Sequence, residues 1–237
     1  MEPYSHEFFS RMLPGTLHSA RRIVPRLVEL FRPRNVVDIG CGPGAWLSVF
    51  RVQGILDVLG IDGSRVDPTL LQIPVEQIRV HDLGTPVRLD RKFDLAISLE
   101  VAEHLPASCA EVFVDNLVAL APLIVFSAAI PFQGGTNHLN EQWPAYWTKR
   151  FETRGYRAVD CLRREFWNDA QVEWWYSQNM LVFCRKDQLE KHPFLQQECA
   201  HAQCDPLALV HPRLFLQAVQ TIRTLQQERE TRTPTRP

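Results

Sequence analysis

The stretch Val36 to Gly44, V-V-D-I-G-C-G-P-G, combines a short apolar run, one acid and three glycines. Apolar β-branched residues that end at glycine are typical of a buried parallel strand leading into a tight turn. Gly40, Gly42 and Gly44 carry no Cβ, so a ligand can approach the backbone of that turn closely. A helix that begins near Ala45 would point its N-terminal amide groups at the turn. The stretch therefore predicts the ligand-binding turn of an α/β sheet.

The same stretch fits two classes of cofactor. It matches the dinucleotide-binding pattern G-x-G-x-x-G/A, with Ala45 in the last place and Asp62 at the spacing of a ribose-binding acid. Asp38, however, lies where it can face a cation such as the ammonium of methionine, and Pro43 removes an amide that a pyrophosphate would use. D-I-G-C-G-P-G resembles motif I of the class I methyltransferases. This resemblance implies S-adenosylmethionine as the cofactor and a Rossmann-like α/β fold.

Length and composition set limits on the class of protein. The chain has 237 residues, 45% of them hydrophobic, which fits one α/β domain with an extension. A net charge of −1 makes nucleic acid the less favoured substrate. Six cysteines without C-x-x-C pairs predict reduced thiols and a cytoplasmic protein. Because we find no cationic, apolar leader and no apolar run of about 18 residues, we expect neither export nor a membrane span.

Seven apolar runs alternate with helical patterns along the chain. This alternation predicts a mostly parallel sheet with helices on both faces, and the methyltransferase resemblance implies that the last strand is antiparallel. Residues 1–34 predict an amphipathic helix, interrupted or started near Pro25, that acts as a lid or a cover. We expect the cofactor-binding domain at 35–186, and a C-terminal extension at 187–237 with one packed helix and a disordered end. The predicted strands are 36–39, 55–61, 77–80, 93–99, 123–130, 156–162 and 180–184.

Acids follow the second and third predicted strands. Asp62 ends the second strand, at the edge of the sheet where ligands bind, and the resemblance implies that its carboxylate accepts both ribose hydroxyl protons. Asp82 and Leu83 follow the third strand. The resemblance implies that the Asp82 carboxylate takes the exocyclic amine of adenine and that the Leu83 amide reaches a ring nitrogen. The alternative for Asp82 is an Asx turn before Gly84.

A second constellation follows the fourth and fifth predicted strands. Glu100 ends the fourth strand, Glu103 and His104 are expected in the first turn of the next helix, and His138 follows the fifth strand. Two carboxylates and two imidazoles suit Mg²⁺, Mn²⁺, Fe²⁺ or Zn²⁺. Such a metal would lower the pKa of a substrate hydroxyl beside the cofactor methyl group. E-x-x-E-H with a later His resembles the metal-binding set of ubiquinone-pathway and small-RNA 2′-O-methyltransferases.

The same four residues can also be interpreted without a bound metal. E-V-x-E-H-L is frequent in class I methyltransferases, where Glu100 would line the methionine end of the cofactor pocket. Glu103 would then interact with a helix N-terminus, and His104 would be a general base or structural. An intermediate reading keeps His104 or His138 as the general base without a metal.

The loop after the fifth strand carries polar and aromatic residues, G-G-T-N-H-L-N-E-Q-W-P-A-Y-W over 134–147. S-L-E-V-A-E-H-L-P and H-x-N-E-Q-W-P-x-Y-W resemble a bacterial group of class I methyltransferases. Two glycines favour a mobile flap, with His138 and Glu141 as catalytic candidates. Trp143 and Trp147 would stack on a sugar or an aromatic ring. The run 174–176, W-W-Y, is either a wall of the substrate pocket or core.

The sequence therefore predicts an S-adenosylmethionine-dependent enzyme that methylates a hydroxyl of a small molecule or a glycan. Catalysis would be in-line positioning of the acceptor against the methyl group, assisted by His104, His138, Glu141 or a bound metal. The alternatives are an N-methyltransferase, an RNA 2′-O-methyltransferase and a non-catalytic cofactor-binding subunit. We expect a homodimer as the assembly and no membrane partner.

Overall fold

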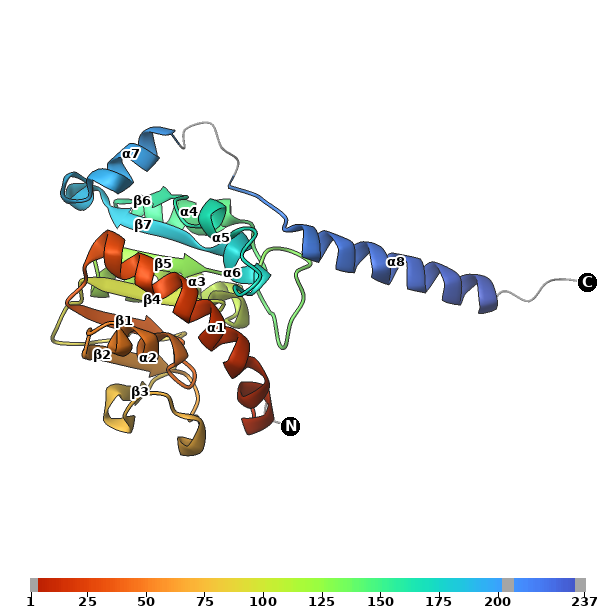
Figure 1. Cartoon of the computed structure of the whole chain (residues 1–237), viewed down its shortest axis with the longest axis horizontal. Helices are drawn as coiled ribbons and strands as arrows, with labels where there is room; N and C mark the ends of the chain where they lie inside the picture. Colours follow the sequence, from red (N-terminus) through yellow and green to blue (C-terminus); the bar gives the residue numbers. More distant parts are fainter. Residues whose placement is uncertain (1–3, 202–206, 233–237) are drawn as a thin grey trace, which may run out of the picture.

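The computed structural model describes residues 4–201 and 207–232 and contains a sheet of seven strands (Figure 1). In space the strands follow the order β3-β2-β1-β4-β5-β7-β6. Paired strands are parallel except at β7, which runs antiparallel to β5 and to β6. The predicted mostly parallel sheet with an antiparallel last strand is confirmed. The strands are β1 Asn35–Ile39, β2 Asp57–Asp62, β3 Ile78–Val80, β4 Leu95–Leu99, β5 Leu123–Ser127, β6 Tyr156–Val159 and β7 Leu181–Arg185.

The direction of the strand order reverses between β1 and β4. Asp38 of β1 pairs with Gly60 of β2 on one side and with Ile97 of β4 on the other. In open α/β sheets a ligand crevice forms at such a reversal, beyond the carboxyl ends of the strands. The topology therefore places a crevice at the ends of β1 and β4.

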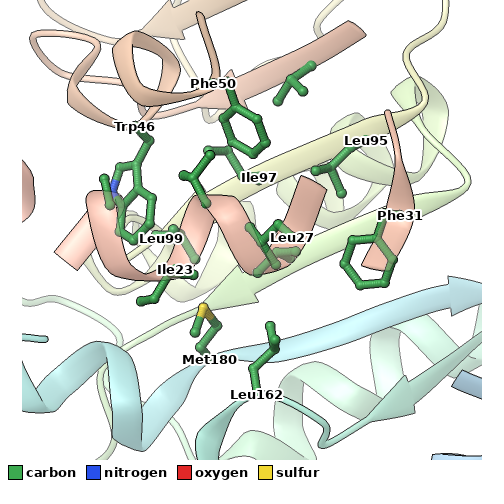
Figure 2. Packing of buried hydrophobic residues seen from close by; sticks show 14 of the residues in the cluster. Ile23, Leu27, Phe31, Trp46, Phe50, Leu95, Ile97, Leu99, Leu162 and Met180 are labelled. Atoms are coloured by element: carbon green, nitrogen blue, oxygen red, sulfur yellow. The ribbon is translucent and has the colours of Figure 1, made fainter. Parts of the chain in front are cut away.

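Helices cover both faces of the sheet and bury two apolar clusters. The first lies under α1 and α2, and Figure 2 shows Ile23, Leu27 and Phe31 of α1 in it with Leu95 and Ile97 of β4. The second joins α3 and α4 to the opposite face. A fully buried side chain of this size contributes about 1.5–3 kcal/mol. The helices are α1 His6–Phe31, α2 Ala45–Val52, α3 Ala110–Leu120, α4 Pro144–Thr153, α5 Arg163–Phe166, α6 Trp174–Asn179, α7 Pro193–His201 and α8 Pro212–Arg232.

The helix α1 is continuous, so the predicted interruption or start near Pro25 is wrong. Pro14 and Pro25 both lie inside it, although a proline inside a helix removes a backbone hydrogen bond and costs about 3 kcal/mol. Ile23, Val24 and Leu27 are fully buried against the sheet. Their burial offsets the cost of the prolines, and a local pattern of helix breakers does not include that contribution.

The C-terminal part differs from the predicted single packed helix. Leu195 of α7 is fully buried in the first cluster, beside β6, so α7 belongs to the body of the protein. Leu214 is buried in the first turn of α8, but Phe215 and Ile222 are more than half exposed, and Figure 1 shows α8 projecting from the body. The prediction that this helix packs on the body is wrong beyond its first turn. The predicted disorder concerns residues 233–237, outside the described residues.

Two features of the described chain bear on its environment. Between residues 4 and 201 and between 207 and 232, no helix has both the length and the apolarity needed to cross a membrane. The cysteines with free thiols are Cys41, Cys109, Cys161, Cys184 and Cys199.

Candidate active site

The turn after β1 joins that strand to α2. The Gly40 N–H donates to the carbonyl of Ile61 at the end of β2 (2.7 Å), and the Gly42 N–H donates to Oδ2 of Asp62 (2.7 Å). All three glycines have positive φ, 86° at Gly40, 49° at Gly42 and 81° at Gly44, a region that L side chains rarely adopt. The predicted turn between strand and helix is present, and the Asp62 side chain is part of it.

The glycines of the turn are closely packed by other residues of the protein. A Cβ built on Gly40 would overlap Cγ2 of Val101, and one built on Gly44 would lie 2.7 Å from Cγ1 of Ile73. At Gly42 the nearest atom, 3.2 Å away, belongs to the ring of Phe9 in α1. The absence of Cβ atoms therefore serves packing at Gly40 and Gly44, whereas the sequence suggested only room for a ligand.

We predict that Gly40→Ala destabilises the protein by about 3 kcal/mol. An alanine with positive φ costs about 1 kcal/mol, and overlap with Val101 adds about 2 kcal/mol. Gly54→Ala is the matched control, because Gly54 has a φ of 89° and, among the described residues, no atom within 4 Å of its added Cβ. Urea unfolding of both variants measures the difference. Equal losses would show that Val101 moves aside at no cost.

A cavity of about 420 Å³ opens beside the glycine turn, within the size range of small-molecule sites. Its lining comes from the turn, the end of β4, the loop before α4, the N-terminal half of α1, and α6. The lining combines aromatic and apolar side chains with carboxylates and imidazoles. The side chains that matter below are Phe8, Phe9, Arg11, Met12, Glu100, Glu103, His104, Gln133, His138, Trp174, Trp175 and Tyr176.

Asp38 and Asp62 lie near the ends of neighbouring strands, and neither lines the cavity. Asp38 is 2% exposed, and its Oδ2 has no hydrogen-bond partner within the part of the chain that the structure describes. Burial, with a smaller contribution from the charge of Asp62, raises the pKa of Asp38 well above its usual value. Oδ1 of Asp62 accepts from the backbone N–H and the hydroxyl of Ser64 (3.0 and 2.9 Å). A buried carboxylate without a partner is costly, so this point of the site suits a cationic ligand group.

Asp82 and Leu83 lie near Asp62 but outside the cavity lining. The His81 N–H donates to the carbonyl of Asp62 (2.8 Å), which fixes the segment beside the end of β2. Asp82 is exposed, and its Oδ1 accepts from the Gly84 N–H (2.9 Å), so the Asx turn is formed. Leu83 is buried. The adenine-binding role of Asp82 and Leu83 stays a prediction.

Three of the four predicted metal ligands come together. One ligand atom each from Glu103, His104 and His138 lies within 4.8 Å of the other two. Glu103 and His104 occupy a separate 3₁₀ turn, Ala102–His104, so the expectation that they begin the helix α3 is wrong. The fourth predicted ligand, Glu100, is held by other contacts and is not part of the group.

Glu103 is buried and His104 is partly buried, and both carry side-chain atoms that lack a hydrogen-bond partner in the described part of the chain. Glu103 is 0% exposed, and neither carboxylate oxygen has a partner with hydrogen-bond geometry among the described residues. Burial and the charge of Glu100 raise its pKa well above the usual value, although the nearby amides of Glu103 itself and Ala129 oppose this shift. Burial and the neighbouring His138 lower the pKa of His104 to about 4. His104 is therefore a neutral imidazole at pH 7, able to bind a metal or accept a proton.

Glu141 orients His138. Nδ1 of His138 lies 2.8 Å from Oε1 of Glu141, so the ring donates to this carboxylate and keeps a lone pair on Nε2. Oxygens of Glu141 also accept from the N–H groups of Phe132 and Gly134 (2.7 and 2.8 Å). Glu141, predicted as catalytic, does not line the cavity, and it contacts the site through His138 and the loop.

Glu100 is placed by an unusual backbone and by amide side chains. Its φ is 56°, and such a conformation in a residue other than glycine costs about 1–3 kcal/mol. Its carboxylate accepts from Nε2 of Gln133 (2.8 Å) and Nδ2 of Asn179 (3.0 Å). The sequence patterns did not identify three residues of the site, Gln133, Gln178 and Asn179. The available signal was the polar pair Gln178 and Asn179 directly before the apolar run of β7.

The aromatic residues divide between cavity and core. Trp174, Trp175 and Tyr176 line the cavity, as one of the two alternatives proposed. Trp147 is 2% exposed and contacts Phe126 in the core, with ring centroids 5.3 Å apart. The expectation that Trp147 stacks on a substrate is therefore wrong, since α4 turns it toward the sheet.

The strand order, the glycine turn and the acids at the strand ends define a class I, Rossmann-like methyltransferase fold. A family model described as "Methyltransferase domain" matches residues 13–168, more than half of the chain. The chain belongs to this family, whose members use S-adenosylmethionine.

The proteins with similar solved structures include methyltransferases that are named for different molecules. Magnesium protoporphyrin IX methyltransferase (ChlM) from Synechocystis PCC 6803 is 22% identical, with a TM-score of 0.52 and coverage of 72% of this chain and 80% of that one. The plantazolicin methyltransferase BpumL is 15% identical, with a TM-score of 0.53 and coverage of 77% and 89%. DesVI of Streptomyces venezuelae is 14% identical, with a TM-score of 0.52 and coverage of 72% and 92%. At these identities the likeness shows the fold.

One sequence match is short. Over 34 residues the chain is 44% identical to ribosomal RNA large subunit methyltransferase E of Caulobacter sp. (strain K31). This match spans 14% of the chain and 15% of that protein.

Proposed function

We propose that the protein transfers the methyl group of S-adenosylmethionine to a hydroxyl of a small molecule or a glycan. The observation that supports this best is that the glycine turn and the group of Glu103, His104 and His138 line the same cavity. In this proposal the turn forms the cofactor side, and the group forms the acceptor side. Asp62, bonded to Gly42, and the unpartnered Asp38 belong to the cofactor side, although neither lines the cavity. One shared cavity allows a direct transfer between the two sides.

The residues on the cofactor side fit S-adenosylmethionine, which supplies a methyl group activated by a sulfonium. In this proposal the carboxylates of Asp38 and Glu100 attract the ammonium of the methionine part, and Asp62 accepts the ribose hydroxyls. Asp82 and Leu83 contact the adenine. Asp38 carries the strongest support, because its buried oxygen has no other partner in the described chain.

The first turns of α1 cover the glycine turn, which supports the proposal that residues 1–34 act as a lid. Phe9 lies over Gly42. Tyr4 packs edge-on against His104, with ring centroids 5.6 Å apart, and it also contacts Phe8. These aromatic rings therefore bridge the cofactor side and the acceptor side, where a cover must open for ligands to enter.

His138 is the proposed general base. Its Nε2 takes the proton of the acceptor hydroxyl as the new O–C bond forms and the S–C bond breaks, leaving S-adenosylhomocysteine. The carboxylate of Glu141 stabilises the imidazolium and keeps the ring in the required tautomer. Trp174 and Trp175 of the cavity lining hold an apolar face of the acceptor.

A divalent metal is a second candidate for activating the hydroxyl. Glu103, His104 and His138 would hold it, and the donor set of one oxygen and two nitrogens favours Mn²⁺, Fe²⁺ or Zn²⁺ over Mg²⁺. The metal would lower the pKa of the acceptor hydroxyl. The unpartnered oxygens of Glu103 favour this version, and Glu100 is left out of the ligand set because amides already hold it.

The acceptor class rests on the chemistry of the cavity. Arg11 is the one lysine or arginine in the lining described, and the net charge of −1 gives no attraction for RNA. An amine acceptor and a non-catalytic role are the remaining alternatives, and cytoplasmic location and a homodimer remain predictions. The similar proteins named above include porphyrin, ribosomal RNA and plantazolicin methyltransferases, so they do not select an acceptor.

Calorimetry followed by an acceptor screen tests the proposal. We expect one site per chain for S-adenosylhomocysteine and no binding of NAD. We then expect S-adenosylhomocysteine to form from S-adenosylmethionine with phenols or sugars, and not with amines or RNA. His138→Ala should keep the binding and lose the turnover. Failure to bind S-adenosylhomocysteine would refute the cofactor, and turnover of amines or RNA alone would refute the acceptor class.

A further inference from the structure

A cluster of side-chain amides lies behind Glu100, at the end of the cavity near α6. Gln178 and Asn179 end α6 and are 0% and 3% exposed, and Gln133 reaches them from the loop after β5. Asn179 Nδ2 donates to both carboxylate oxygens of Glu100 (3.0 and 3.2 Å), and Gln133 Nε2 donates to one of them (2.8 Å). Nothing in the mechanism proposed above uses these amides.

The direction of the hydrogen bonds in this cluster is fixed by one backbone group. The His211 N–H donates to Oε1 of Gln178 (2.7 Å), and a backbone N–H cannot accept, so that atom must be the amide oxygen. Nε2 of Gln178 therefore donates, to Oε1 of Gln133 (3.0 Å) and to Oδ1 of Asn179 (2.9 Å). Since both oxygens are thus acceptors, the nitrogens of Gln133 and Asn179 face Glu100.

Every amide that reaches Glu100 is consequently a donor. N–H donors favour the ionised carboxylate, which only accepts. They oppose the effect of burial, which raises the pKa of Glu100. The same donors also compensate for the positive φ of Glu100, which needs support from its surroundings. The cluster thus orients the Glu100 carboxylate in the cavity that Gly40 and Gly42 also line, where a cationic ligand group would favour its ionised form.

We propose that Gln178 and Asn179 are positioning residues that present the Glu100 carboxylate to the ammonium of the amino-acid part of the cofactor. This inference rests on the proposed cofactor. It adds that residues 207–211 support the amide cluster from behind. Arg163 is fully buried and ties this segment to the cluster, because its Nη1 donates to the carbonyls of Gln178 (3.1 Å) and Leu207 (2.7 Å). The segment before α8 is therefore part of the cofactor site, although it lies far from the glycine turn in sequence.

Two ligands distinguish positioning from a general structural role. S-adenosylhomocysteine carries the amino-acid part, whereas 5′-methylthioadenosine has the same nucleoside and thioether without it. We expect Asn179→Leu to weaken the binding of S-adenosylhomocysteine about 10-fold, as expected for lost hydrogen bonds to a charged group, and to leave 5′-methylthioadenosine unchanged. Calorimetry of the full-length chain measures both. Gln178→Leu should give the same pattern with a smaller loss.

Two controls and one replacement variant make the outcomes of this experiment unambiguous. Gln77→Leu removes an amide that donates to the Leu56 carbonyl far from the cavity, and it should change neither affinity. In the double variant with Glu100→Gln, the effect of Asn179→Leu should largely disappear, because Asn179 acts through Glu100. Asn179→Ser replaces Asn179→Leu if the leucine variant does not fold, with the same expected selectivity.

The outcomes separate this inference from the proposed function. If the wild type binds neither ligand, the proposed cofactor is wrong. If the wild type binds both and Asn179→Leu loses both equally, or loses neither, the positioning role is overturned while the cofactor stands. A selective loss of S-adenosylhomocysteine supports the inference.

Discussion

Asp62→Ala is expected to weaken the binding of S-adenosylhomocysteine by at least about 100-fold. The Asp62 carboxylate accepts from the Gly42 N–H and from both the N–H and the hydroxyl of Ser64. It thereby holds the glycine turn against the end of β2. In the proposed complex it also accepts the ribose hydroxyls, and each hydrogen bond to a charged group is worth about 1.5–3 kcal/mol. The loss of two such hydrogen bonds lowers the affinity for S-adenosylhomocysteine by two or more orders of magnitude.

Calorimetric titration of purified Asp62→Ala measures this loss, and Asp67→Ala is the matched control. Asp67 lies in the next turn, where its Oδ1 accepts from the N–H and the hydroxyl of Thr69 (2.9 and 2.7 Å), as Asp62 does from Ser64. Asp67 is exposed, and its hydrogen bonds stay within its own turn, whereas Asp62 also holds the Gly42 N–H. Removal of the Asp67 side chain should therefore change the affinity less than threefold. An Asp62→Ala variant that binds as tightly as the Asp67→Ala variant would refute the ribose role.

The sheet and the glycine turn could be predicted because their signals are local. An apolar run that ends in glycines specifies a buried strand and a turn whatever the rest of the chain does, and the seven strands lie where the runs placed them. Local signals did not predict α1, because burial of Ile23 and Leu27 outweighed the helix-breaking effect of Pro25. They did not predict the position of α8 either, because an apolar stripe does not show whether a partner surface exists.

Individual residues of the candidate site could be predicted, but the way in which they combine could not. E-x-x-E-H places Glu100 and Glu103 near each other in sequence, but which carboxylate joins the histidines depends on residues from distant elements. Asn179, which precedes β7, donates a hydrogen bond to Glu100, so the carboxylate of Glu100 is not part of the metal group. This hydrogen bond forms only because β7 inserts beside β5. The roles of Glu103 and Glu100 therefore separate at the level of tertiary structure.

Manganese is expected to raise the free energy of unfolding of the wild type by about 2.7 kcal/mol at a metal concentration 100 times its Kd. The reason is the state of Glu103, a fully buried carboxylate whose oxygens lack hydrogen-bond partners in residues 4–201 and 207–232. A cation held by Glu103, His104 and His138 would compensate this charge. Thermal unfolding of metal-free protein with and without MnCl₂ measures the gain.

Glu103→Gln should have opposite effects in the two conditions. Without metal we expect this variant to be more stable than the wild type by about 1–3 kcal/mol, because a neutral amide is less costly to bury than an unpartnered carboxylate. With MnCl₂ it should gain nothing, whereas His18→Ala, at an exposed histidine of α1, should gain as much as the wild type. A wild type that does not respond to manganese, or a Glu103→Gln variant that responds equally, would rule out the metal version. His138 would then remain as the base. Replacing Glu103 by glutamine thus tests whether its unpartnered carboxylate serves to bind a cation. A carboxylate that served only folding would not lower the stability of the metal-free protein.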